Sequence, residues 1–213
     1  MHEAIARLEI VAVDDNSEYM KNAYKRVGSD RAGQPTDPDA IAAGVSAEID
    51  LWSETQTKAG IELRDRHADC YLIGRDRAAL ENYLATLAPV PNGRKLVLEH
   101  VTPLPDAKDH REYWRTYYVN RTKIIDETAI ASASTVEPDE QTIHPSVSMK
   151  FTPAGKDAFA EATAKHVGHK LATIVDGDVV IAPVINNAIR GGVVTLSMPS
   201  TSAADQLLKR LGC

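Results

Sequence analysis

The sequence of 213 residues is poor in aromatic residues and in cysteine. Aromatic side chains make up 5% of the chain and hydrophobic residues 43%, so the predicted core is built mainly from Ala, Val, Ile and Leu. The two cysteines, Cys70 and Cys213, show no C-x-x-C spacing and cannot form a zinc site by themselves. We expect both to be unpaired thiols, with Cys70 acting as a small core residue.

Long hydrophobic runs and blocks of positive charge are also lacking. Residues 1–9 have no basic region followed by an apolar stretch, and about 18 consecutive apolar residues occur nowhere, so we expect neither a signal peptide nor a membrane span. Asp and Glu number 30 against 24 Lys and Arg, which gives a formal net charge of −6. Because no basic patch matches a phosphate backbone, we expect no nucleic-acid partner.

The amino-terminal half alternates β-rich and helical patterns. Residues 8–13 predict a strand, and a helix capped by Asp15 or Asn16 follows and ends at Gly28. A carboxylate pair at Asp14 and Asp15 could serve acid/base chemistry, but capping is the simpler interpretation. A second helix is predicted from Asp37-Pro38 onward, because the following apolar residues have helical spacing: Ile41, Val45, Ile49 and Trp52.

The middle of the chain predicts a β-α-β unit and then a boundary. Residues 70–73 favour a buried strand, Asp76 is placed to cap a helix, and residues 95–101 alternate as a strand. The segment 102–112 contains two prolines and several charges without periodicity. We therefore expect two subdomains to meet there.

The carboxyl-terminal half begins with an aromatic strand and a polar stretch. Thr152-Pro153 is typical of a helix start, and Asp176-Gly177 is a strong hairpin signal. Ser202 with Asp205 resembles a capping box that opens the last helix. The predicted elements are strands at 113–119, 147–151, 171–175, 179–181 and 193–198, a helix at 153–167 stopped by Gly168, and a final helix that buries Leu207, Leu208 and Leu211.

Candidate catalytic and metal-binding residues have simpler explanations. His166 and His169 could share a metal by their i, i+3 spacing, but Gly168 interrupts the helix between them, and no carboxylate or thiol partner is predictable nearby. No nucleotide-binding, zinc-protease or serine-hydrolase motif occurs. We therefore predict no catalytic, cofactor-binding or metal-ligating residues, and expect that the chain is not an enzyme.

A series of landmarks in the carboxyl-terminal half resembles the head subdomain of SecD, a bacterial protein-export subunit. The landmarks are Val147 to Gly155, Phe159, Thr163, Val167-Gly168, Leu171-Ala172, Asp176-Gly177, Ala182-Pro183, Ile189 and Gly191-Gly192. Upstream, Leu8 to Asp14, Tyr71-Leu72 and Arg115 to Tyr118 are similar to pieces of longer SecD versions. The resemblance therefore covers nearly the whole chain.

The resemblance implies an α+β fold with antiparallel-rich sheets and helices on one face, arranged as a ferredoxin-like base portion at 1–107 and a head subdomain at 108–213. It implies an excised extracytoplasmic domain, on the periplasmic face of the cytoplasmic membrane, that contacts an emerging unfolded preprotein and moves its head relative to its base. SecF and the SecYEG channel would be partners of the intact subunit, which would meet the membrane through segments absent here. Candidate contact residues are Val184, Ile185, Ile189, Gly191 and Gly192, although core packing explains the apolar ones equally well.

Two other hypotheses come from different classes. A freestanding soluble peptide- or protein-binding module could have kept the head fold without a role in translocation. A hydrolase that uses Cys70 or a His/Asp pair is the least supported, because no positioned nucleophile and base can be named. The mass and compartment of the native protein would separate the export-subunit hypothesis from the freestanding module. The reactivity of Cys70 toward thiol reagents would test the hydrolase hypothesis.

Overall fold

The computed structural model describes residues 7–28, 30, 34–54, 64–102, 111–138, 144–198 and 200–211. They form two compact units, each with its own hydrophobic core. Unit 1 comprises Met1–Ala12, Thr122–Val167 and Leu171–Cys213, and unit 2 comprises Val13–Arg121 and Gly168–Lys170. Both combine antiparallel strands with helices, which confirms the predicted α+β class. None of the helices in the described ranges is long and apolar enough to cross a membrane.

Unit 2 contains a split β-α-β arrangement typical of ferredoxin-like folds. Strands β3 and β4 both run antiparallel to β5, which lies between them, and helix α3 connects them. Strand β2 pairs with the other side of β3. In spatial order the strands are β4 (Arg94–Val101), β5 (Tyr113–Asp126, up to Arg121 in this unit), β3 (Arg64–Gly74) and β2 (Val45–Glu54).

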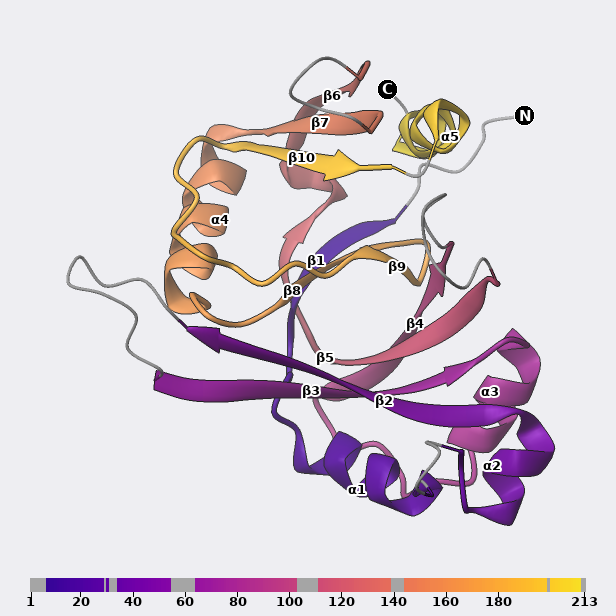
Figure 1. Ribbon diagram of the computed structural model, residues 1–213. Helices are drawn as coiled ribbons and strands as arrows, with labels where there is room; N and C mark the ends of the chain where they lie inside the picture. Colours follow the sequence, from indigo (N-terminus) through magenta and orange to yellow (C-terminus); the bar gives the residue numbers. More distant parts are fainter. Residues whose placement is uncertain are drawn as a thin grey trace. The chain divides into compact units, whose positions relative to one another are not determined.

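Three helices pack on one face of this sheet (Figure 1): α1 (Glu18–Val27), α2 (Pro38–Ala43) and α3 (Arg77–Leu84). The predicted caps of the second and third helices are confirmed, because Asp37 accepts a hydrogen bond from Asp39 N and Asp76 accepts one from Ala79 N. The core between helices and sheet contains Met20, Ala23, Val27, Ala40, Val45, Cys70, Leu72, Leu80, Tyr83, Leu98 and Tyr118. Cys70 is buried and unpaired, as predicted, whereas Cys213 lies outside the described residues.

The prediction of a helix through Val45, Ile49 and Trp52 was wrong. Helix α2 ends at Ala43 because Gly44 adopts a left-handed conformation with φ 65°, and the chain continues as strand β2. A spacing of four residues fits both a helix and a strand. Apolar residues also stand at every second position, 45, 47, 49 and 51, which is the pattern of a strand. The segment forms a strand because it pairs with β3.

Neither Asp15 nor Asn16 caps helix α1, so this prediction was also wrong. The N-cap is Ser17, whose side chain accepts a hydrogen bond from Tyr19 N at 3.1 Å. Asp15 is instead buried, and its carboxylate binds groups supplied by residues 169 and 170. Helix α1 ends at Gly28 as predicted.

Unit 1 contains two groups of strands around one core. Strand β1 pairs antiparallel with β8, which pairs with β9, and β7 lies between β10 and β6. Their bounds are β1 (Leu8–Val13, up to Ala12 in this unit), β6 (Ile130–Val136), β7 (Ser146–Phe151), β8 (Leu171–Val175), β9 (Asp178–Ile181) and β10 (Val193–Ser197), with the short helix η1 at Glu127–Ala129.

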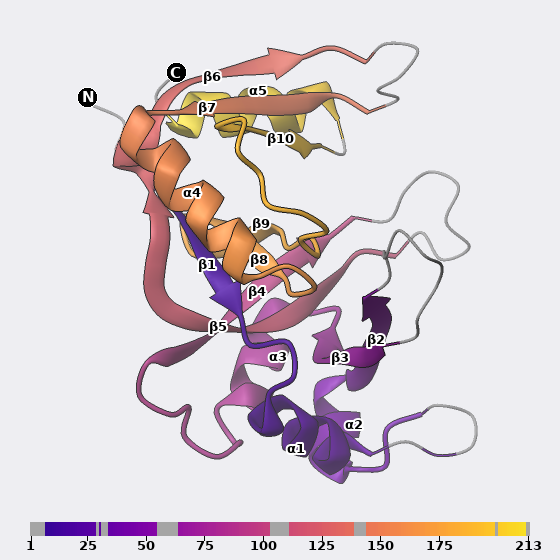
Figure 2. The ribbon, with the colours of Figure 1, turned by 90° about the vertical axis from the view of Figure 1, so that its left-hand side faces the viewer.

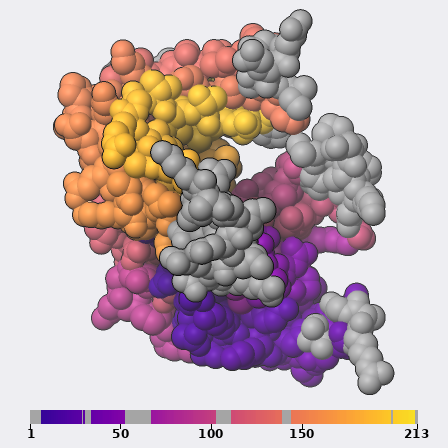
Figure 3. All heavy atoms as spheres, turned by 60° about the vertical axis from the view of Figure 1, so that its left-hand side comes forward, coloured from indigo at the N-terminus to yellow at the C-terminus, as the bar shows by residue number. Residues whose placement is uncertain are grey.

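Helices α4 (Pro153–Lys165) and α5 (Thr201–Leu211) complete unit 1. Helix α5 packs against β6 and β7 (Figure 2), and part of the yellow carboxyl-terminal segment lies at the surface in Figure 3. The core includes Leu8, Ile10, Ile125, Val147, Met149, Phe151, Phe159, Leu171, Val175, Ile185, Leu196, Ala204, Leu207 and Leu211.

The local signals in unit 1 had mixed outcomes. Thr152 caps α4 and Asp176-Gly177 forms the hairpin turn, both as predicted, with positive φ at both turn residues. The prediction of a capping box at Ser202 was wrong, because the side chain of Ser200 accepts the hydrogen bond from Ala203 N. Strand β6 was not predicted, since its mixture of small and polar residues carries little hydrophobic periodicity.

The close approach of helix α4 to η1 depends on Gly155. A Cβ atom at this position would lie 2.8 Å from both Cβ and O of Ala129. We expect Gly155→Ala to lower the free energy of unfolding of unit 1 by about 1 to 3 kcal/mol through overpacking, although alanine favours a helix more than glycine does. Denaturant unfolding followed by hydrogen exchange in α4 would measure this loss.

Gly191 is the matched control for this substitution, because a Cβ atom added there meets no atom within 4 Å. Gly191→Ala should change the free energy of unfolding by less than about 0.5 kcal/mol. Equal stability of the two variants would contradict a packing role for Gly155.

The spatial division of the chain does not follow sequence order. The predicted boundary segment 102–112 lies largely outside the described residues. Residues 113–121 of β5 belong to unit 2 and residues 122–126 to unit 1, while Gly168–Lys170 belongs to unit 2 although its neighbours on both sides belong to unit 1. The assignment of base and head to residues 1–107 and 108–213 stays a prediction.

Candidate functional site

The predicted preprotein-contact residues lie in unit 1, between β9 and β10. Ile185 is buried in the core, and Ile189 packs against the same core while half-buried. Val184 is half-buried, Gly191 is exposed and Gly192 is buried. The structure thus places these residues on one segment and leaves Val184, Ile189 and Gly191 with accessible surface.

This segment is held at several points by named interactions. The hydroxyl of Thr163 donates to the carbonyl of Phe159 at 2.8 Å and accepts from Ile189 N at 2.9 Å. Phe151 N donates to Gly192 O at 2.9 Å, and Gly192 adopts φ 71°, a conformation that favours glycine. Thr163 and Gly192, two of the landmarks of the resemblance, therefore both help to anchor this segment.

We expect Thr163→Val to release the segment near Ile189. Valine keeps the shape of threonine but leaves the amide of Ile189 without its acceptor, and Thr163 is fully buried. The expected loss is about 1 to 3 kcal/mol, the usual cost of an unsatisfied buried polar group. Hydrogen exchange at the Ile189 amide should accelerate.

Thr163→Ser is the control, since it keeps the hydroxyl at the same position. It should retain most of the protection at the Ile189 amide. Faster exchange in the serine variant than in the valine variant would overturn the assignment of the hydroxyl as the anchor.

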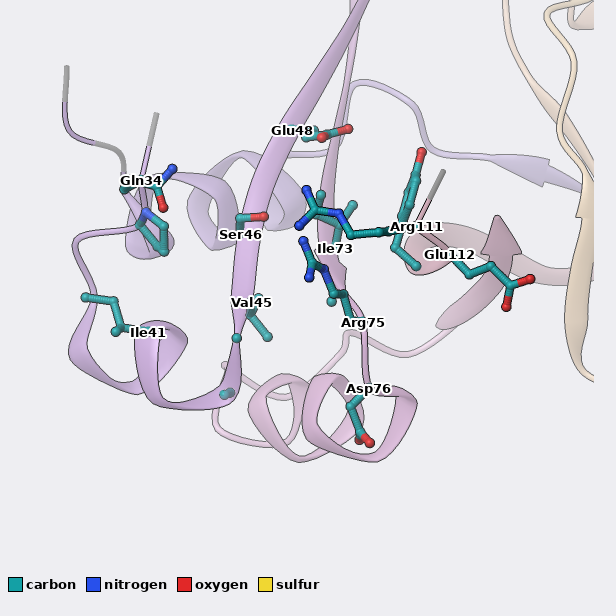
Figure 4. A pocket seen from close by; sticks show the side chains of 15 residues that line it. Gln34, Ile41, Val45, Ser46, Glu48, Ile73, Arg75, Asp76, Arg111 and Glu112 are labelled. Carbon is teal, nitrogen blue, oxygen red and sulfur yellow. The ribbon is translucent and has the colours of Figure 1, made fainter. Parts of the chain in front are cut away.

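A groove of about 800 Å³ lies in unit 2, between the start of β2 and the turn that joins β3 to α3. Figure 4 shows the guanidinium groups of Arg75 and Arg111 directed toward Ser46 on β2, with Glu48 farther along the same strand. Ile41 and Ile73 add apolar surface. The lining thus combines charged, polar and apolar side chains.

Strand β2 is the outermost strand of the unit 2 sheet, next to this groove. Its apolar face is buried at Val45 but becomes exposed farther along, at Ile49 (43% exposed) and Leu51 (63%). An outermost strand offers backbone N–H and C=O groups, and here it adds exposed apolar side chains. Strand addition of an extended peptide uses an edge of this kind.

A buried ionic cluster lies on the other face of the unit 2 sheet. Lys170 is 5% exposed, and its Nζ atom lies 3.2 Å from Asp69 Oδ2 and 3.1 Å from Asp50 Oδ2. It also contacts the hydroxyl of Tyr71, and it lies 4.6 Å from the centre of the Trp52 ring. The cation is thus enclosed by two carboxylates and two aromatic rings.

Burial and hydrogen bonding have opposite effects on the pKa values of the two carboxylates in this cluster. Burial raises the pKa of Asp69 to about 6, against the opposite effect of the Lys170 charge. At Asp50 burial also opposes ionisation, but the hydrogen bonds from Tyr71 and Lys170 outweigh it, so the pKa of Asp50 is lowered. The pKa of Tyr71 is raised by burial and by the Asp69 charge, which keeps the phenol protonated.

A second ion pair extends this polar face along β4 and β5. Arg115 binds Glu99 through Nε at 2.9 Å and Nη2 at 2.6 Å, and Tyr117 donates to the same carboxylate oxygen at 2.9 Å. The guanidinium lies 4.9 Å from the ring centre of Tyr71. The groups named in this cluster satisfy one another, which is typical of a stabilising network rather than a reactive one.

Sequence reasoning missed the ionic cluster because its members lie far apart in the chain. Asp50 and Lys170 are 120 residues apart, and the alternation of polar with apolar residues along β3 was the single local signal.

The structure argues against a hydrolase that uses Cys70 as its nucleophile. Cys70 is a core residue, and burial raises the pKa of its thiol, which disfavours the reactive thiolate.

Fold and surfaces define an α+β domain with a strand edge, a groove lined by charged and apolar side chains, and internally satisfied ionic networks. Residues 102–211 match the family model described as "SecDF, P1 head subdomain". The match covers just over half of the chain, so the protein belongs to this family. The resemblance to SecD inferred from the sequence is therefore confirmed.

Curated relatives are subunits of the protein translocase. SecD of Rhodobacter capsulatus is 31% identical over 128 residues, which cover 59% of this chain and 21% of that protein. SecD of Rickettsia felis is 34% identical over 113 residues, covering 50% of this chain and 20% of that protein. The chain thus spans about a fifth of the length of these relatives.

A solved structure described as "Structure and function of a membrane component SecDF that enhances protein export" is also similar. It is 21% identical, with a TM-score of 0.40, and the alignment covers 96% of this chain and 92% of that chain.

Proposed function

We propose that the chain acts as the extracytoplasmic domain of a SecD-type subunit and contacts an unfolded preprotein as it emerges from the membrane. The observation that carries the proposal is the family match over residues 102–211. The domain would work on the periplasmic face of the cytoplasmic membrane without catalysing a reaction. SecF, the SecYEG channel and membrane-spanning segments of the subunit would be its partners.

Strand β2 supports the contact with preprotein. Unfolded segments of different sequence share an extended backbone and exposed apolar side chains, and a strand edge with Ile49 and Leu51 can bind both features. Backbone pairing tolerates many sequences, whereas apolar contacts favour segments that have not yet folded. The segment with Val184 and Ile189 in unit 1 is the second candidate surface.

Movement of the head relative to the base is the second part of the proposal. Its support is the presence of two separate hydrophobic cores, because units with their own cores can keep their internal structure while they rearrange. Spin labels at two exposed positions, Lys25 in unit 2 and Asp205 in unit 1, would report a change in distance during export. An unchanged distance distribution in translocating and resting membranes would contradict movement.

Photocrosslinking in the source cells tests the preprotein contact directly. A photoreactive amino acid at Leu51, and another at Val184, should crosslink to a secreted protein that is arrested during export. The exposed position Lys25 on helix α1 serves as the control and should give background yield. Leu51→Asp should abolish strand addition and slow export, because a charge on an edge strand blocks pairing.

Crosslinks at Lys25 as strong as those at Leu51 and Val184 would show that these surfaces are not selective and would contradict the proposal. An immunoblot of fractionated cells adds an independent test. We expect the protein in the membrane fraction with an apparent mass well above 23.2 kDa, the mass of this sequence. A band near that mass outside the membrane would instead support the freestanding binding module.

A further inference from the structure

Three potential metal ligands from distant parts of the chain meet in unit 2. They are Asp15, after strand β1, His67 on strand β3, and His169 in the Gly168–Lys170 segment. Each offers one ligand atom, and these three atoms all lie within 4.8 Å of one another. Two imidazole nitrogens and one carboxylate oxygen form a donor set that binds divalent transition metals.

The carboxylate of Asp15 is oriented by its surroundings. Asp15 is 3% exposed, its Oδ2 atom accepts the backbone N–H of Lys170 at 2.9 Å, and its Oδ1 atom lies 2.9 Å from Nδ1 of His169. One oxygen is therefore occupied by the backbone, while the other is next to the imidazole. In metal sites, a ligating carboxylate is commonly oriented in this way by a hydrogen bond to its second oxygen.

His67 provides an independent observation that points to a missing ligand. Its Nε2 atom is buried and has no hydrogen-bond partner among the described residues, a situation that costs free energy unless something occupies it. The ring is held between two others, since it stacks on Trp52 at 5.7 Å between centres and meets the His169 ring edge-on at 4.8 Å. Trp52 is itself fixed by a hydrogen bond from Nε1 to the carbonyl of Gly168 at 2.8 Å.

We propose that Asp15, His67 and His169 bind one divalent transition-metal ion of the Zn²⁺ type, with water completing the coordination. Zinc bonds of about 2.0 Å place tetrahedral ligands about 3.3 Å apart. The widest separation in the cluster, within 4.8 Å, therefore has to shorten by about 1.5 Å at most, and the 2.9 Å between Asp15 Oδ1 and His169 Nδ1 has to widen by about 0.4 Å. Movement of His169, whose side chain is 41% exposed, can supply this change while His67 stays stacked on Trp52. Mg²⁺ and Ca²⁺ are disfavoured because they prefer oxygen ligands.

The ion would connect three segments that are far apart in the sequence. Asp15 and His169 are separated by 154 residues and lie outside the strands, whereas His67 lies on β3. Because the ligands come together in the folded chain, binding would stabilise unit 2 against unfolding. This inference does not depend on the proposed role in export, and its test involves no export measurement.

Isothermal titration of the metal-free 213-residue chain with ZnCl₂ tests the site. We expect one equivalent of zinc to bind and MgCl₂ to give no comparable heat. His67→Gln and His169→Gln should each weaken zinc binding more than about tenfold. His166→Gln is the matched control, because His166 lies three residues from His169 but outside the cluster, and it should bind zinc as the parent does.

A measurement on the unsubstituted chain guards against variants that fail to fold. Zinc should protect His169, whose side chain is 41% exposed, from modification by diethylpyrocarbonate and leave the reaction of His166 unchanged. Circular dichroism would establish that the glutamine variants are folded before their titration. Zinc binding that survives both substitutions, or the absence of any stoichiometric binding together with unprotected His169, would overturn the proposal.

Discussion

Lys170→Met is expected to lower the free energy of unfolding of unit 2 by about 3 to 5 kcal/mol at neutral pH. The substitution keeps the length and apolar stem of the side chain but removes the cation that lies 3.2 Å from Asp69 Oδ2. Asp69 is 2% exposed and cannot recover its lost interaction from water. The uncompensated buried carboxylate is the cause of the large effect.

The loss should grow as the pH rises. Burial already places the pKa of Asp69 at about 6 in the folded protein, above its usual value, and removal of Lys170 raises it further. A carboxyl group with a raised folded pKa binds its proton more tightly in the folded chain, so stability is lost as the pH rises through that pKa. The variant and the parent should therefore differ less at pH 5 than at pH 8.

Urea unfolding with hydrogen exchange at β3 would measure this difference at both pH values. Lys170→Met combined with Asp69→Asn should recover much of the loss, because it removes the unpaired charge. Lys21→Met is the control for loss of a lysine, since Lys21 forms an ion pair with exposed Glu18 and such pairs contribute less than about 1 kcal/mol. Equal effects at Lys21 and Lys170 would contradict this explanation.

Phe159→Ala is expected to lower the free energy of unfolding of unit 1 by about 3 to 5 kcal/mol. Phe159 on helix α4 is 4% exposed, and its ring lies 5.1 Å from that of Phe151 on β7. Aromatic residues are scarce in this chain, so the ring fills space that smaller side chains nearby cannot fill. Truncation therefore removes apolar contacts and leaves a cavity.

Hydrogen exchange resolved by residue would show where this loss occurs. Protection should fall in β8 of unit 1, whereas β3 of unit 2, which belongs to the other core, should keep its protection. Lys165→Ala, at an exposed position of the same helix, should leave both unchanged. Equal losses in β8 and β3 would show that the two cores unfold as one cooperative structure.

Several short-range signals were confirmed where a few adjacent residues determine the backbone. Thr152-Pro153 and Asp76 start helices, and Asp176-Gly177 turns the hairpin, because capping and positive φ depend on the residue and its immediate neighbours. The landmarks around them were sufficient to recognise the family, which the match over residues 102–211 confirms.

Some predictions failed because the deciding partner lies elsewhere in the chain, and others because a neighbouring residue took the predicted role. Val45 to Trp52 fits a helix by spacing, but pairing with β3 makes it a strand. Asp15 has the chemistry of a cap, yet Ser17 occupies that position and Asp15 is buried against residues 169 and 170. Among the predicted contact residues, Ile185 is buried in the core, and contact of this segment with a preprotein stays a prediction.

The sequence by itself determined the α+β class, the position of most helices and strands, and the family, since these follow from local periodicity, caps, turns and ordered landmarks. The tertiary structure alone decided which charged groups are buried together. Lys170 meets Asp50 and Asp69, and His169 meets Asp15 and His67, across separations of about a hundred residues or more. The energies of these groups depend on distance and burial, and neither quantity exists until the chain has folded.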